Sequence, residues 1–104
     1  MSIVPGSTVI QDPNAELAYE WNWSDWLVGE AVIDESEFIV SEIAGDATPL
    51  VADDESVLEG DTSTRVLLSG GTVGKTYTVT NRVTTDEVPP QIDDRSIKVK
   101  IAAQ

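Results

Sequence analysis

Acidic clusters are the first residues of this 104-residue chain whose types and spacing could do chemistry. Asp53-Asp54-Glu55, Asp86-Glu87 and Asp93-Asp94 could supply oxygen ligands to a calcium ion if two loops converge. None has the spacing of a known calcium loop, so solvated loop charge is favoured. Paired carboxylates could also act as acid and base, but with 19 Asp and Glu residues a chance pair is unavoidable. We therefore predict a protein that is not an enzyme, without catalytic or metal-binding residues.

The glycine-rich segment Gly70 to Thr76 is the second candidate, because it ends like a phosphate-binding Walker loop in Gly74-Lys75-Thr76. The full motif needs a glycine at position 69, where this chain has Ser69. A strand is expected to follow the segment, whereas a Walker loop opens a helix. Nucleotide binding is disfavoured, and we expect no cofactor.

Two chemically versatile residue types are missing, since the chain has no cysteine and no histidine. Disulfides, a thiolate nucleophile and the commonest general base and metal ligand are therefore excluded. No apolar run approaches the roughly 20 residues that span a bilayer. The N-terminus lacks the basic start and apolar block of a secretory signal. We expect one soluble domain made inside the cell, with no membrane partner.

Charge is unevenly distributed along the chain. Residues 1–60 carry fourteen carboxylates and no Lys or Arg, whereas residues 61–104 carry five carboxylates and all six cations. The net charge of −13 would repel phosphates, which argues against a nucleic-acid partner. A solvated acidic face is the favoured interpretation, with an acidic surface matched to a basic partner as the alternative. Self-association of the acidic part of one copy with the mixed part of another would also fit.

The elements that must position these residues are short strands between frequent turns. Apolar or alternating runs predict strands at 7–11, 16–23, 30–33, 37–41, 63–69, 75–84 and 95–101, with a weaker one near 49–52. No segment has a sustained 3.6-residue apolar period, so little helix is expected. The pattern predicts an all-β sandwich of about seven to eight antiparallel strands. Residues 1–14 would be an extended N-terminal arm or first edge strand, and residues 15–104 the sandwich domain.

All three tryptophans fall within six residues, directly after Leu17 and Tyr19. Strand alternation places Leu17, Tyr19, Trp21 and Trp23 on one face, ahead of a corner at residues 24–26. We interpret this face as core, with a sugar-stacking platform as the alternative for the tryptophans. Trp26 follows the corner and is the tryptophan that could face a partner.

The last two predicted strands alternate clearly. Tyr77, Val79, Asn81 and Val83 share one face of the first, and Ile97, Val99 and Ile101 share one face of the second, with lysines outward. Outward lysines on a terminal strand would discourage edge pairing. The loop Asp86 to Asp94 between the two strands should project from one end of the sandwich. The predicted core residues are Tyr19, Trp21, Trp23, Tyr77, Val79, Val83, Ile97 and Val99.

The turn before Tyr77 resembles the tyrosine corner of immunoglobulin-like (Ig-like) sandwiches, in which the hydroxyl bonds back to nearby backbone. The cysteine of antibody domains is replaced by Val79, so the resemblance is to the wider Ig-like class. The expected architecture is therefore a single Ig-like β-sandwich.

Several motifs together resemble a family of small Ig-like structural proteins of tailed bacteriophages, over most of residues 15–101. They are Tyr19-x-Trp21-x-Trp23-Ser24-Asp25-Trp26-Leu27, the Gly29-Glu30 turn, Gly70-Gly71-Thr72-x-Gly74-x-Thr76-Tyr77, and Asp94-Arg95-Ser96-Ile97. The resemblance implies a non-enzymatic role in the virion, after assembly in the host cytoplasm. It leaves the position on the virion open.

Three functional hypotheses follow from the resemblance. The main one is a capsid decoration or cement protein on the major capsid lattice. The alternatives are a head-tail junction or tail component, in which the arm or the final strand augments a neighbour's sheet, and a glycan-binding adhesion module. Partners would be phage capsid or neck proteins, and residues 1–11 would be dispensable for the fold. The candidate partner contacts are Ile3, Val4, Val9, Ile10, Trp26, Val88, Pro89 and Pro90.

Overall fold

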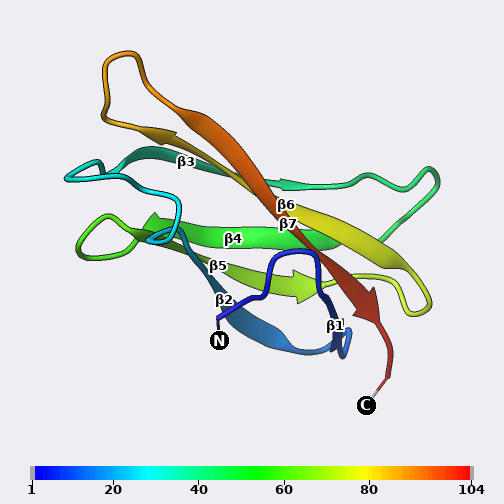
Figure 1. Ribbon diagram of the computed structural model, residues 1–104. Coiled ribbons are helices and arrows are strands. Elements are labelled where there is room, and N and C mark those ends of the chain that lie inside the picture. The colour runs from blue at the N-terminus through cyan, green and yellow to red at the C-terminus, as the bar shows by residue number, and fades with distance from the viewer. Residues whose placement is uncertain (1, 104) are drawn as a thin grey trace.

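Seven β-strands make up the protein over residues 2–103, which are the residues that the computed structural model describes. They are β1 (Thr8–Gln11), β2 (Glu16–Asn22), β3 (Ile33–Val40), β4 (Leu50–Val57), β5 (Ser63–Gly70), β6 (Thr76–Thr85) and β7 (Ile92–Ile101). One sheet has the order β1-β7-β6-β3 and the other β2-β5-β4, and the two sheets pack as the layers of a sandwich (Figure 1). The predicted all-β sandwich is confirmed, and the architecture is consistent with the Ig-like class.

One strand pairing departs from the predicted antiparallel arrangement. β1 pairs in parallel with β7, with Thr8 opposite Lys98 and Gln11 opposite Ile101, while every other pairing of the seven strands is antiparallel. β7 therefore lies between β1 and β6 and is not an edge strand. The inference that its outward lysines protect an open edge is wrong, because β1 already covers that edge.

The N-terminal segment crosses from one sheet to the other. Ser2 bridges Glu20 of β2, and the N–H of Ile3 donates to the Glu20 carbonyl at 2.9 Å. After the turn at Gly6, whose N–H donates to the Ser96 carbonyl at 2.8 Å, the chain enters β1. The segment thus runs along the edges of both sheets.

Gln11 fixes this segment in the core. Its side chain is 1% exposed, its Nε2 donates to the Leu68 carbonyl at 2.9 Å, and its Oε1 accepts the Tyr19 hydroxyl at 2.8 Å. Removing Gln11 would leave these buried groups without partners, which costs about 1 to 3 kcal/mol for each group. We therefore expect that deletion of residues 1–11 would destabilise the fold, contrary to the prediction from the sequence.

Strand boundaries differ where the sequence pattern is weak. In place of the two strands predicted at 30–33 and 37–41 there is one strand, β3, with a bulge between Ile33 and Glu35, and residues 30–32 belong to the preceding loop. β4 extends through Asp53-Asp54-Glu55 to Val57, beyond the predicted 49–52. β7 begins at Ile92, so the projecting loop is residues 86–91 and Asp93-Asp94 lie in a strand. Backbone pairing with neighbouring strands overrides the low β-propensity of these acidic residues.

The core fills the space between the sheets. All eight side chains predicted for it are buried, and Ile33, Leu50, Val66, Leu68 and Ile101 join them. Leu17 does not, since it is 40% exposed at the start of β2. The tryptophan run is therefore a core anchor at Trp21 and Trp23, which removes those two rings from any sugar platform.

A buried asparagine holds the two sheets in register. The Oδ1 of Asn81 accepts hydrogen bonds from Trp23 Nε1 at 2.9 Å and from Thr64 Oγ1 at 2.6 Å. Its Nδ2 donates to Ser36 Oγ at 2.8 Å and to the Glu37 carbonyl at 3.0 Å. All of its hydrogen-bonding capacity is used, which makes the burial of a polar amide tolerable. Trp23 is thereby fixed, and with it the start of the loop that follows.

The tyrosine corner lies at the end of the sandwich opposite the loop that follows Trp23. The Tyr77 hydroxyl accepts the N–H of Thr72 at 3.0 Å, five residues upstream, as the comparison with Ig-like turns predicts. It also donates to the Asp46 carboxylate, to which Thr72 Oγ1 donates at 2.5 Å. Hydrogen bonds from Thr72 and Tyr77 lower the pKa of Asp46. We call Asp46, Thr48, Thr72 and Tyr77 the corner network.

Candidate partner-binding surface

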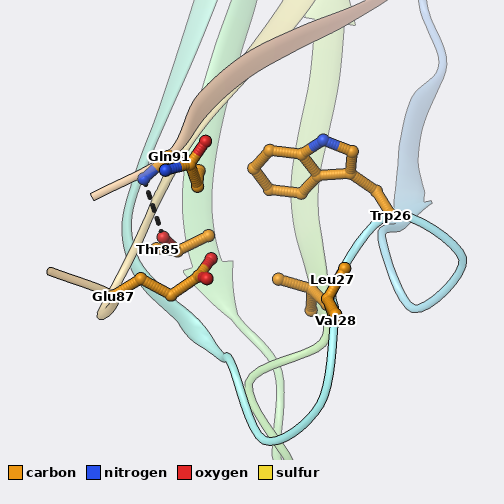
Figure 2. Close-up of a pocket in the computed structure, with 6 residues that line it drawn as sticks. All are labelled: Trp26, Leu27, Val28, Thr85, Glu87 and Gln91. Carbon is orange, nitrogen blue, oxygen red and sulfur yellow. Dashed lines mark hydrogen bonds between the residues drawn. The ribbon is translucent and has the colours of Figure 1, made fainter. Parts of the chain in front are cut away.

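Two loops meet at the end of the molecule opposite the tyrosine corner (Figure 1). They are the connection between β2 and β3 (residues 23–32) and the β6–β7 loop (residues 86–91). Between them lies an open hollow of about 310 Å³, shown in Figure 2. The residues that line this loop-end hollow are Trp26, Leu27, Val28, Thr85, Glu87 and Gln91. One wall is therefore apolar and the facing wall polar.

The apolar wall is positioned by the core. The carbonyl of Trp23 accepts the N–H groups of Trp26 at 2.9 Å and Leu27 at 3.1 Å, which closes a tight turn. The Trp26 ring packs edge-on against the buried Trp23 ring, with centroids 5.3 Å apart. Trp26 and Leu27 are partly buried, so their remaining surface faces the hollow. The corner predicted at residues 24–26 is present and serves to turn Trp26 outward.

Hydrogen bonds tie the two loops together. The N–H of Val32 donates to Asp86 Oδ1 and the N–H of Asp86 donates to the Val32 carbonyl, both at 3.1 Å. Across the base of the β6–β7 loop, the N–H of Gln91 donates to Thr85 Oγ1 at 2.9 Å (dashed in Figure 2), and the N–H of Thr85 donates to the Gln91 carbonyl. The hollow is thus held in shape without a partner, which reduces the entropy that binding would cost.

Exposed apolar side chains occur in both loops that form the hollow. Val28 is 77% exposed and Val88 98% exposed, and Pro89 and Pro90 beside Val88 are also exposed. Apolar surface gathered in one place, with polar residues around it, is typical of interaction sites. This end is therefore a candidate surface for binding another protein.

Charge at this end is mostly negative. The two nearby arginines are already paired, Arg95 with Asp25 at 2.9 Å and Arg82 with Asp94 at 2.8 Å. The hydrogen bonds from Arg95 lower the pKa of Asp25, and those from Arg82 lower the pKa of Asp94. Glu87 has no hydrogen-bonding or ionic partner among residues 2–103, and it faces the hollow (Figure 2).

The structure divides the predicted partner contacts into two groups. Trp26, Val88, Pro89 and Pro90 come from the two loops at the hollow, although the sequence places them some sixty positions apart. The other four lie on the N-terminal segment along the sheet edges. There Ile3 and Val9 are partly buried against the core, whereas Val4 and Ile10 are exposed and offer more surface to a partner.

Sequence reasoning did not select five of the lining residues, Leu27, Val28, Thr85, Glu87 and Gln91. A signal was available for Val28, because the apolar run Trp26-Leu27-Val28 stands directly before the Gly29-Glu30 turn. Apolar residues next to a turn are exposed unless another segment covers them. No comparable signal marks Thr85 or Gln91, whose role depends on the pairing of β6 with β7.

The acidic clusters do not come together. Within residues 2–103, no three His, Cys, Asp or Glu side chains are placed to hold a metal ion. Asp94 instead pairs with Arg82 across β6 and β7. No helix in the described part of the chain has the length and apolarity needed to cross a membrane.

Comparison with known families adds one match. The family model described as "Podophage GP4 fiber-tail adaptor protein gp77" matches residues 11–100. The matched region runs from the buried Gln11 through both loops of the hollow and nearly to the end of β7. No curated protein matches the chain.

Proposed function

We propose that this protein joins a fibre to the tail of a phage particle, since the chain belongs to the podophage GP4 fiber-tail adaptor protein gp77 family. Membership of this family makes it a structural protein of a phage virion. The match along residues 11–100 is the observation that carries this proposal. In this role the protein would be non-enzymatic and would act through contacts with other tail proteins.

The family revises the ranking of the earlier hypotheses. A capsid decoration or cement role was the main one, and the family match does not support it, whereas a tail component fits the family description. Capsid proteins accordingly give way to tail proteins as the expected partners. The glycan-binding alternative, which relied on Trp26 and the loops, gains no further aromatic surface, because Trp21 and Trp23 are buried.

An adaptor needs two separate contact surfaces on a rigid body, and the sandwich offers them. The loop-end hollow is one. The other is the side formed by the edge strands β3 and β4, where Glu35, Glu37, Asp53, Asp54 and Glu55 are exposed. Bulges between Ile33 and Glu35 and between Asp53 and Ser56 interrupt these edges, which disfavours strand addition there. Contact through this side would rely on charge and would weaken with salt.

Cryo-electron microscopy of the intact particle tests the proposal. We expect density for the sandwich where the fibre meets the tail, in a copy number set by the symmetry of the tail. Copies spread over the head lattice would overturn the proposal in favour of decoration, and density at the far end of the fibre would favour adhesion.

A genetic test is independent of imaging. Particles assembled without this protein should have complete heads and lack fibres, and supplying the wild-type chain should restore them. Fully fibred particles assembled in its absence would contradict an adaptor role.

A further inference from the structure

We propose that the loop-end hollow binds an apolar side chain that has Lys or Arg close to it in sequence, carried by an exposed segment of a neighbouring tail protein. This proposal rests on the proposed function, since it assumes that the protein has a protein partner in the tail. It goes further in naming the surface and the chemistry of the partner.

The size and lining of the hollow indicate that the partner segment inserts an apolar side chain. At about 310 Å³ it lies at the lower end of the range of roughly 300 to 1,000 Å³ for ligand pockets. It has room for a side chain or two, and none for a whole helix or strand. Trp26, Leu27 and Val28 form one continuous apolar wall (Figure 2). An aliphatic or aromatic side chain inserted against this wall would remove apolar surface of both partners from water.

The unpaired carboxylate of Glu87 indicates that the partner segment is positively charged. Glu87 faces the hollow from the wall opposite Trp26 (Figure 2), and no Lys or Arg lines the hollow. An occupant that covered Glu87 without giving it a partner would strip water from a carboxylate, which is costly. A Lys or Arg beside the apolar side chain would instead form an ion pair with Glu87. The acidic Glu30 and Asp86 in the same two loops add to the attraction.

A hydrogen-bond donor and an acceptor for the partner's backbone are also present. The indole N–H of Trp26 and the side-chain Oε1 of Gln91 have no hydrogen-bonding partner within residues 2–103, while Gln91 Nε2 donates to the Pro89 carbonyl at 3.2 Å. An extended segment has free carbonyl and N–H groups that fit this pair. A segment with an exposed backbone thus suits the hollow better than a folded surface.

A second copy of this chain is the competing occupant. Most of its exposed apolar residues outside the loop end lie in the part of the sequence that contains no cation, namely Val4, Ile10, Leu17 and Val51, while Val28, Val88 and Ile92 belong to the loop end itself. Val73, two residues before Lys75, is the exception, but it lies at the corner end. Insertion of Val73 into the hollow of the next copy would be a head-to-tail contact, which repeats into a filament unless it closes into a ring. A different tail protein is therefore the better match.

Peptide arrays test the chemistry directly. The purified 104-residue protein would be probed against overlapping 12-residue peptides that cover all structural proteins of the same virion, head proteins included. We expect the bound peptides to come from tail proteins and to carry an apolar residue within two positions of Lys or Arg. Affinity, measured by tryptophan fluorescence in solution, should fall at least tenfold for Val28→Asp and for Glu87→Lys.

Charge exchange supplies the sharpest control. A peptide in which the Lys or Arg is replaced by Glu should bind Glu87→Lys better than it binds the wild-type protein. Glu42→Lys, the same charge change on the exposed β3–β4 connection away from the hollow, should leave affinity within twofold of the wild type. Both changed positions are exposed, so near-UV circular dichroism should show an unaltered fold.

Several outcomes would overturn the inference. They are the absence of any bound peptide, selection of acidic or uncharged peptides, equal loss from Glu42→Lys and Glu87→Lys, and self-association of the protein that Val73→Ser abolishes. Failure of the proposed function is a separate result, namely density on the head in the imaged particle. A protein found where the fibre meets the tail that selects acidic peptides would retain its adaptor role and lose only this inference.

Discussion

The two ends of the sandwich differ in whether their loop side chains have partners within the chain. At the corner end, Asp46, Thr72 and Tyr77 bond to one another, and the carboxylate finds its partners within the chain. At the loop end, Glu87 has no partner in the described structure, and Val28 and Val88 lie open to water. Backbone hydrogen bonds order both ends, so the difference lies in the side chains.

This contrast separates residues that serve the fold from residues that are available for binding. A polar group satisfied within its own chain contributes to folding and has little left to offer a partner. An exposed apolar side chain or an unpaired carboxylate contributes little to folding and gains when a partner covers it. Substitutions at the corner end should therefore alter stability, and substitutions at the rim of the loop end should alter binding.

The largest effect is expected where the loop end rests on the core. Trp23→Ala should lower the free energy of unfolding by about 3 to 5 kcal/mol, because it empties a fully buried site and removes a hydrogen bond to Asn81. Trp26→Ala, three residues away and partly buried, should cost roughly 1 to 2 kcal/mol. Urea denaturation of both variants measures the difference. Equal losses would mean that the Trp26 ring belongs to the core and serves the fold, and that it is not available for binding.

Two glycines of the corner end provide the next comparison. Gly71 has a φ of +96°, and an added Cβ would lie 2.6 Å from Ile101 Cγ1. Gly71→Ala should therefore cost about 2 to 4 kcal/mol, from backbone strain together with overpacking. Gly74→Ala meets strain alone, at a φ of +88° with nothing within 4 Å, and should cost about 1 kcal/mol. Thermal denaturation followed by circular dichroism would rank the two variants, and equal costs would show that the Ile101 side chain shifts to accommodate the added methyl group.

The corner network also predicts a dependence on pH. The pKa of Asp46 is lower in the folded protein than in the unfolded chain, so its contribution is complete above the unfolded value near 4 and disappears as the pH falls through the folded value. Asp46→Asn should reduce stability at pH 7 and flatten the loss of stability between about pH 4 and pH 2.

Denaturation midpoints over that pH range provide the test for Asp46. Asp34→Asn, which removes an exposed carboxylate of β3, is the matched control and should leave the slope nearly unchanged. Asp25 and Asp94 also have lowered pKa values, so part of the acid sensitivity should survive in Asp46→Asn. A variant with the full wild-type slope would show that the network contributes nothing to acid sensitivity.

The smallest effect on stability is expected at the rim of the hollow. Val28→Ser and Val88→Ser change side chains that are 77% and 98% exposed, so each should alter the free energy of unfolding by no more than about 0.5 kcal/mol. Fibre attachment to particles should nevertheless decrease in the Val28 variant. A clear loss of stability, or normal attachment with Val28→Ser, would erase the contrast between the two ends.

The sequence already contains much of the fold, for reasons that particular residues make plain. Alternation of apolar and polar residues predicts the inward faces of β6 and β7, because side chains of a strand point alternately to opposite sides. Tyr77 after a glycine-rich turn predicts the tyrosine corner, which depends on residues close in sequence. β4 was underestimated because Asp53-Asp54-Glu55 has low β-propensity. The strand continues past this stretch because Asp53 and Ser56 pair with β5 on the two sides of a bulge.

What the sequence by itself determined is the class of protein: an acidic all-β sandwich with a tryptophan core and motifs of phage structural proteins. The tertiary structure alone decided that Gln11 closes the core and that β1 covers β7, because both depend on contacts between the start and the end of the chain. It likewise decided which exposed residues form one surface. Trp26 and Glu87 lie far apart in the sequence and line one hollow only because the loops that follow β2 and β6 lie at the same end of the sandwich.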